Sequence, residues 1–152
     1  MTLDQFTIIA LSLLLAGIAF WIGLEFRPEP KRPPLSDDPL TIDEMVFESF
    51  ETSRQKGWHE EPRTVGDLIA LMHSELSEAL EEFRDGQPAD KIWFRGVDGG
   101  PAKPEGVPVE LADVVIRIGD FCGRYGIDLD EALRIKMYYN RTRPHRHGGK
   151  VL

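Results

Sequence analysis

The sequence predicts an all-α fold in which a four-helix bundle follows a single N-terminal transmembrane helix and a proline-rich linker. Three observations support this prediction. Residues 6–24 contain no charged side chain, residues 26–40 are rich in proline, and residues 41–152 carry apolar side chains at the three- and four-residue spacing of amphipathic helices. We therefore expect a membrane anchor over residues 1–25, a linker over residues 26–40 and a helical domain over residues 41–152.

The uncharged run over residues 6–24 predicts the membrane anchor. At about 1.5 Å per residue, a helix of this length matches the hydrocarbon core of a bilayer. A cleaved signal peptide would need a basic segment before the run, whereas Asp4 is the only charged side chain there. Arg27, Lys31 and Arg32 follow the run, so the positive-inside rule predicts a single-pass protein whose catalytic domain lies in the cytoplasm.

The linker cannot form a regular helix, because proline lacks the backbone amide hydrogen and favours extended polyproline geometry. Its prolines are Pro28, Pro30, Pro33, Pro34 and Pro39. We expect a semi-rigid spacer, and a ligand for a partner domain that recognises proline-rich segments is the alternative.

Capping patterns divide the remaining sequence into four helices. Thr41 and Thr64 begin the first and second helices and Asp128 begins the fourth, since each is followed three positions later by an acidic residue. The third helix is expected over residues 109–124. The residues predicted to end the four helices are Gly57, Gly86, Gly126 and Pro144.

Residues 86–108 separate the second and third helices and contain too much glycine and proline for regular structure. A loop this long in a small domain is commonly a lid, an oligomer contact or a disordered segment. The aromatic side chains Trp93 and Phe94 in its middle favour an ordered role. Trp93 is therefore a candidate substrate contact.

Two acidic pairs, Glu75 with Glu78 and Glu110 with Asp113, lie on the second and third predicted helices. Residues three apart share a helix face, and each pair lies at the edge of an apolar face. If the two helices pack together, four carboxylates converge and repel one another unless a cation lies between them. Hard oxygen ligands of this kind suit Mg²⁺ or Mn²⁺. An ordinary solvated helix flank is the alternative for either pair alone.

From about Trp58 to the C-terminus, the sequence resembles the MazG-like all-α nucleoside triphosphate pyrophosphohydrolases, which are related to dCTP pyrophosphatases and dimeric dUTPases. The family pattern is an E-x-x-E helix, a spacer, an E-x-x-D helix and a helix with Lys and Asn. The matching residues are Glu75, Glu78, Glu110, Asp113, Lys136 and Asn140. The spacer of about thirty residues is longer than in most members.

The resemblance implies hydrolysis of a nucleoside triphosphate to the monophosphate and pyrophosphate, with Mg²⁺ or Mn²⁺ held by the four paired carboxylates. Glu75 and Glu78 would also be the catalytic residues. The substrate contacts expected are Lys136, Asn140 and Arg143, which share a helix face, together with Trp58 and Trp93. Trp58 is either part of the base pocket or a core anchor. Because the relatives are oligomers, a homodimer or homotetramer is expected.

Composition argues against other functions. A net charge of −8 provides no basic field for a nucleic-acid polymer. No Glu is followed three positions later by His, as a di-iron carboxylate bundle would require. The single cysteine, Cys122, fits a reducing compartment and falls on an apolar helix face, so a buried thiol is expected. The alternative to an enzyme is a non-catalytic, membrane-tethered helical module for interaction or nucleotide binding.

Overall fold

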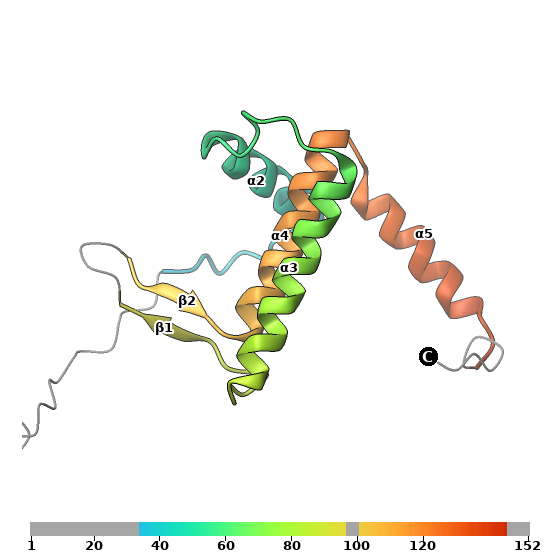
Figure 1. The fold of residues 1–152 in the computed structure, drawn as a ribbon. Helices are drawn as coiled ribbons and strands as arrows, with labels where there is room; N and C mark the ends of the chain where they lie inside the picture. The colour runs from blue at the N-terminus through green and yellow to red at the C-terminus, as the bar shows by residue number, and fades with distance from the viewer. Residues whose placement is uncertain (1–33, 97–100, 146–152) are drawn as a thin grey trace, which may run out of the picture. The chain divides into compact units, whose positions relative to one another are not determined.

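The computed structural model describes residues 34–96 and 101–145, which form four helices and one two-stranded antiparallel sheet (Figure 1). The elements in chain order are α2 (Ile42–Gln55), α3 (Val65–Arg84), β1 (Trp93–Arg95), β2 (Lys103–Glu105), α4 (Val107–Tyr125) and α5 (Leu129–Thr142).

No helix within residues 34–96 and 101–145 is long and apolar enough to cross a membrane. Even the longest helices, α3 and α4, carry acidic and basic side chains along their length. This finding corrects the predicted transmembrane fold, and with it the predicted membrane partner and the membrane-anchored, cytoplasmic localisation. The predicted span over residues 6–24 itself lies outside the described residues.

The helix boundaries follow the capping residues. Thr41 accepts a hydrogen bond from the backbone of Glu44 at 3.2 Å, and the Glu44 carboxylate accepts one from the Thr41 amide at 2.9 Å. Thr64 and Asp67 make the same reciprocal pair at the start of α3. The four predicted helix ends are confirmed, because each helix stops before its expected glycine or proline. Only α4 differs, since it begins at Val107 rather than at residue 109.

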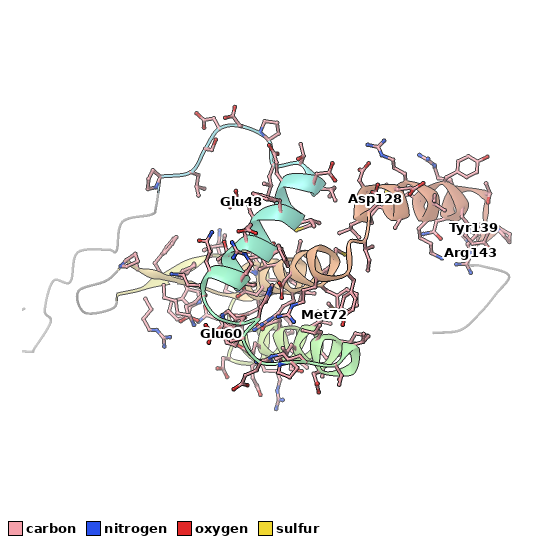
Figure 2. The ribbon with its side chains drawn as sticks, turned by 90° about the horizontal axis from the view of Figure 1, so that it is seen from above. Glu48, Glu60, Met72, Asp128, Tyr139 and Arg143 are labelled. Atoms are coloured by element: carbon pink, nitrogen blue, oxygen red, sulfur yellow. The ribbon has the colours of Figure 1, made fainter. Side chains whose placement is uncertain are left out.

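Helix α4 is the centre of the fold and packs against α2 on one side and α3 on the other, as Figure 2 shows. The contact with α2 is close, because a Cβ atom at Gly123 would lie 2.5 Å from the Cβ atom of Phe50. A Cβ atom at Gly119 would lie 2.8 Å from Ser49 Oγ. Two glycines four residues apart therefore let α2 approach the backbone of α4.

The contact of α3 with α4 buries only part of the face that the apolar pattern predicted, which consists of Ile69, Met72, Leu76, Ala79, Leu80 and Phe83. The buried residues of α3 are Leu68, Glu75 and Ala79. By contrast, the side chains of an outer apolar stripe, here called the α3 stripe, are between 44% and 60% exposed. The α3 stripe consists of Ile69, Leu76, Leu80 and Phe83. The prediction that the acids would lie at the border of a buried apolar face is wrong for Glu75, which is itself buried.

The fourth helix does not complete a closed bundle. The principal contacts of α5 are with α2, and α5 has no buried residue. Ile135 and Tyr138, for example, are largely exposed. The predicted four-helix bundle is therefore corrected to a packed unit of α2, α3 and α4, with α5 attached through α2.

The spacer predicted as an irregular loop contains a hairpin. Strand β1 pairs with β2 so that Trp93 faces Glu105 and Arg95 faces Lys103. The buried Glu105 carboxylate forms ion pairs with Arg95 at 2.6 Å and with Lys103 at 3.2 Å. These pairings connect residues about ten positions apart. Local glycine and proline content therefore did not reveal them.

Two contacts fix the hairpin to the helices. Trp93 Nε1 donates a hydrogen bond to Glu82 Oε2 of α3 at 3.3 Å. Gly106 joins β2 to α4 with a φ of 112°, and a Cβ atom there would lie 2.5 Å from the Lys91 carbonyl oxygen. Because only glycine adopts this geometry readily, Gly106 holds the hairpin at the N-terminus of α4.

Candidate metal and nucleotide site

The carboxylates of Glu75, Glu110 and Asp113 come together where α3 packs on α4. Each offers an oxygen atom, and these oxygens all lie within 4.8 Å of one another. Glu75 and Glu110 are only 7% and 6% exposed. We call these three residues the carboxylate cluster. Glu78, one turn further along α3, lines the pocket beside the cluster.

Burial and electrostatic repulsion both raise pKa values within the cluster. The pKa of Glu110 is raised, first by burial and then by the neighbouring charges of Glu78, Asp113 and Glu75. The pKa of Asp113 is raised by burial and by Glu75, while Arg117 and Lys103 oppose the shift. Both shifts have the direction expected of carboxylates that are crowded and desolvated without enough positive charge.

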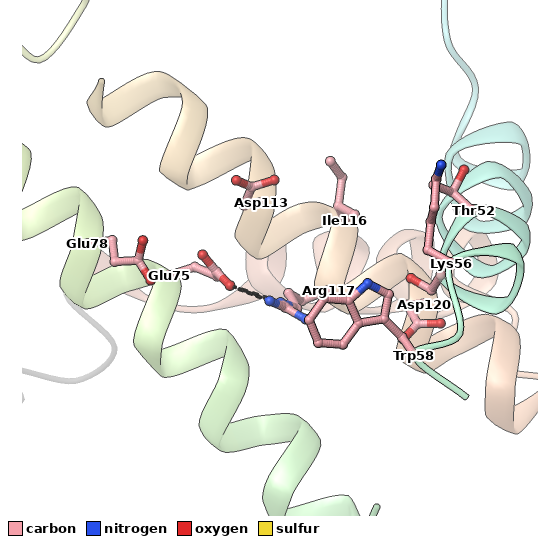
Figure 3. A pocket seen from close by; sticks show the side chains of 10 residues that line it. Thr52, Lys56, Trp58, Glu75, Glu78, Asp113, Ile116, Arg117 and Asp120 are labelled. Carbon is pink, nitrogen blue, oxygen red and sulfur yellow. Dashed lines mark hydrogen bonds and ion pairs between the residues drawn. The ribbon is translucent and has the colours of Figure 1, made fainter. Parts of the chain in front are cut away.

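Arg117 supplies part of the missing positive charge. It lies one turn after Asp113 on α4, and both its Nε and its Nη2 approach Glu75 Oε1, at 2.9 and 2.8 Å (Figure 3). A guanidinium group that donates twice to one carboxylate makes a strong, charge-assisted contact. This ion pair joins α3 to α4 beside the carboxylate cluster.

A pocket of about 380 Å³ opens between the end of α2, α3 and α4. This volume lies in the range of small-molecule sites. Figure 3 shows three carboxylates, those of Glu75, Glu78 and Asp113, at one end of the pocket, and Trp58 with Asp120 and Lys56 at the other. The lining residues are Thr52, Ser53, Lys56, Trp58, Glu75, Glu78, Asp113, Ile116, Arg117 and Asp120.

Trp58 is a wall of this pocket and is not a core anchor, because 51% of its surface is exposed. The guanidinium groups of Arg63 and Arg117 each lie 5.7 Å from the centre of its ring. Its carbonyl oxygen accepts a hydrogen bond from Arg124 Nη2 at 3.0 Å, which ties the connection after α2 to α4. The indole is thus held in place while one part of its ring remains open to solvent.

A second polar group lies beside the pocket, and its contacts were not predicted from the sequence. His59 Nε2 lies 2.7 Å from Asp120 Oδ1, and Arg124 Nε lies 3.5 Å from Asp120 Oδ2. The four-residue spacing of Asp120 and Arg124 is a signal that could have identified the pair on α4. Nothing in the sequence marks their contact with His59, which lies 61 positions before Asp120.

The basic residues predicted to bind phosphate lie elsewhere in this chain. Lys136, Asn140 and Arg143 belong to α5 or its C-cap, and none of them lines the pocket. Lys136 and Arg143 instead lie 5.3 and 5.9 Å from the centre of the Tyr139 ring. Trp93 likewise does not line the pocket, since it belongs to β1 and binds Glu82. Their predicted substrate contacts remain predictions.

The predicted burial of the single cysteine is confirmed. Cys122 is buried on α4, and burial raises the pKa of its thiol. A buried thiol with a raised pKa is a poor nucleophile. Cys122 is therefore a packing residue.

Comparison with known proteins provides one informative relative. No protein-family model matches the chain, and no solved structure does. The chain is 29% identical over 129 residues to human dCTP pyrophosphatase 1, an alignment that covers 82% of this chain and 71% of the relative. This similarity confirms that the chain resembles the MazG-like all-α nucleoside triphosphate pyrophosphohydrolases and the dCTP pyrophosphatases related to them.

Proposed function

We propose that this protein hydrolyses a nucleoside triphosphate to the monophosphate and pyrophosphate in the pocket between α2, α3 and α4. The observation that supports this proposal most strongly is that Glu75, Glu110 and Asp113 converge beside a pocket, and that two of them, Glu75 and Asp113, line this pocket together with Trp58. The similarity to a dCTP pyrophosphatase supports the same reaction class, a hydrolase acting on a nucleotide anhydride.

The carboxylate cluster fits Mg²⁺, and Mn²⁺ could replace it. Its donors are all carboxylate oxygens within 4.8 Å of one another, which suits a hard divalent cation. Burial, and then the neighbouring carboxylates, raise the pKa values of Glu110 and Asp113, and a bound cation would favour the charged form of both groups. Glu75, Glu110 and Asp113 would hold the cation, with Glu78 beside them. When bound, Mg²⁺ neutralises phosphate charge and lowers the pKa of a coordinated water.

Glu78 is the candidate general base. It lines the pocket, and within the described part of the chain it has no hydrogen bond or ion pair, unlike Glu75. A free carboxylate beside the phosphate could accept a proton from the attacking water. Glu75 and Glu78 therefore have different proposed roles, although the sequence pairs them.

Trp58 is the candidate platform for the nucleobase. Its half-exposed ring forms the end of the pocket away from the carboxylates, and its backbone is held by Arg124. A flat aromatic ring of this kind stacks on any base. Stacking alone leaves the base unspecified, so selectivity would depend on the polar groups around the ring.

A homodimer or homotetramer is part of this proposal. The exposed α3 stripe would be covered by a second copy of the chain, as large apolar patches on soluble domains usually are. Lys136, Asn140 and Arg143 could then contact the phosphates bound by a neighbouring copy. Within one chain they do not line the pocket.

The test is release of pyrophosphate from a panel of canonical and modified nucleoside triphosphates with Mg²⁺. We expect equal amounts of pyrophosphate and monophosphate from at least one nucleotide, and none after chelation of the metal. Release of inorganic phosphate instead would indicate cleavage at a different bond. If no nucleotide in the panel is cleaved, the proposed activity is wrong.

A further inference from the structure

Arg117 occupies an unusual position between the two ends of the pocket. Its guanidinium donates to Glu75, a member of the carboxylate cluster, and lies 5.7 Å from the centre of the Trp58 ring (Figure 3). About a third of its side chain, 32%, remains exposed. Arg117 therefore lies where a molecule that joins the aromatic end to the acidic end would have to pass.

The ion pair conflicts with cation binding by the same carboxylate. Both Nε and Nη2 of Arg117 approach one oxygen, Glu75 Oε1. A divalent cation at the cluster would be attracted by the Glu75 carboxylate and would repel the Arg117 guanidinium beside it. Arg117 therefore either weakens cation binding or finds another negatively charged partner when the cation binds.

A nucleotide would provide that partner. The cationic side chains that line the pocket are Lys56 and Arg117, whereas the basic residues of α5 do not line it. A guanidinium fork matches the geometry of phosphate oxygens better than an ammonium group does. Arg117 contacts Glu75 at the acidic end and lies near the Trp58 ring at the aromatic end, so it is the better placed candidate.

We infer that Arg117 exchanges partners: it neutralises Glu75 before substrate arrives and binds the phosphate nearest the nucleoside once nucleotide and cation are in place. This inference rests on the proposed function. The phosphate nearest the nucleoside is assigned because it would lie between a base stacked on Trp58 and a cation at the carboxylate cluster. Arg117 thus couples binding of the cation to binding of the nucleotide.

The exchange predicts effects of opposite sign in one variant, Arg117→Gln. Without nucleotide, Mn²⁺ measured by its electron paramagnetic resonance signal should bind the full-length variant about tenfold more tightly, because a repelling charge is gone. In the presence of Mg²⁺, an α,β-imido nucleoside triphosphate measured by calorimetry should bind about tenfold more weakly, because a charge-assisted phosphate contact is lost. Arg117→Lys keeps the charge, so its Mn²⁺ affinity should stay close to that of the unmodified protein.

Arg63 offers a matched control. Its guanidinium lies the same 5.7 Å from the centre of the Trp58 ring, but it has no ion pair with a member of the carboxylate cluster. Arg63→Gln should leave the Mn²⁺ affinity unchanged. A tighter Mn²⁺ site in Arg63→Gln would mean that general charge near the pocket, and not the Glu75 contact, sets the affinity.

Two outcomes would overturn the inference. If Arg117→Gln weakens both Mn²⁺ and nucleotide binding and lowers the thermal midpoint, Arg117 is a structural link between α3 and α4. If neither affinity changes, its contact with Glu75 has no functional role. The proposed hydrolysis is tested separately. If Arg117→Gln raises the Mn²⁺ affinity and lowers the nucleotide affinity but the unmodified protein releases no pyrophosphate, the partner exchange is supported and the proposed reaction is wrong.

Discussion

Each of the two surfaces of α3 contains side chains that a helix in a soluble domain seldom places there. The surface packed on α4 buries the Glu75 carboxylate, whereas the outer α3 stripe exposes Ile69, Leu76, Leu80 and Phe83. Burying a carboxylate is unfavourable unless it is paired, and exposing large apolar side chains forgoes hydrophobic stabilisation. Arg117 already pairs with Glu75, but Glu110 and Asp113 have no ion pair among the described residues, which supports a cation at the carboxylate cluster. The exposed α3 stripe in turn supports a second copy of the chain as its cover.

The largest effect should come from the inner surface. Asp113→Asn keeps the side-chain volume and removes a charged oxygen from the carboxylate cluster. We expect pyrophosphate release to fall at least about a hundredfold, since loss of residues that only support metal ligands already has effects of about that size. Without metal, the thermal midpoint should stay constant or rise, because repulsion with Glu75 is relieved.

Glu81→Gln is the control for Asp113→Asn. Glu81 lies on α3, whereas Asp113 lies on α4; its side chain is well exposed, and among the described residues it forms an ion pair only with Arg84, at 3.6 Å. This variant should keep full activity. Equal damage from Glu81→Gln and Asp113→Asn would show that overall charge, and not the buried cluster, determines activity.

Substitutions in the outer α3 stripe should change the association of the chain with itself. Leu80→Ser and Phe83→Ser each remove an apolar side chain that one chain leaves exposed, so the folded unit should survive. If a second copy covers the α3 stripe, each substitution should weaken association about tenfold or more, as expected for burial worth about 1.5–3 kcal/mol. Sedimentation equilibrium measures this effect directly.

Leu35→Ser provides the comparison for the assembly experiment, since Leu35 is 81% exposed and lies before α2, outside the α3 stripe. Its association constant should be unchanged. A monomeric wild-type protein would rule out a second copy as the cover of the stripe.

A smaller effect is expected on α5. Lys136→Ala should raise the Michaelis constant for the nucleotide about tenfold if a neighbouring copy's pocket receives this side chain, because one charge-assisted contact is lost. Stability should hardly change, since no residue of α5 is buried. Arg134→Ala, on the same helix and paired with Asp130, should leave the Michaelis constant unchanged. An unchanged constant in Lys136→Ala would exclude the basic face of α5 from substrate binding.

The smallest effect concerns pH. The pKa values of Glu110 and Asp113 are raised in the folded protein, so the folded state binds more protons than the unfolded state between the ordinary and the raised values. Their contribution to stability therefore grows as the pH falls through that window. The thermal midpoint should rise more on addition of Mg²⁺ at about pH 7 than at about pH 5, because protons compete for the same oxygens. Equal shifts would place the cation elsewhere.

Local sequence patterns predicted much of the helical framework. The capping pairs at Thr41 and Thr64 form as expected, and the helices end at the predicted glycines and proline. Each of the two acidic pairs also lies within one helix, as its spacing indicated. These features depend on residues three or four positions apart, for which the geometry of one helix is sufficient.

The predictions failed where distant contacts decide the structure. The hairpin depends on the pairing of Trp93 with Glu105, and the burial of Glu75 depends on which side of α3 meets α4. The apolar residues of α3 indicated one face, but α4 covers only part of it, including Ala79, and leaves the α3 stripe exposed. Amphipathic spacing identifies an apolar helix face, but it does not determine which helix or which copy of the chain covers that face.

The sequence by itself determined the helices, their caps and the presence of four acidic side chains in two pairs, because these follow from local spacing and side-chain chemistry. Only the tertiary structure decided which carboxylates meet, that Arg117 binds Glu75 across 42 positions of sequence, and that Trp58 forms the opposite end of the pocket. The physical reason is that helix packing selects one rotation of α3 and α4 from several that the same pattern permits.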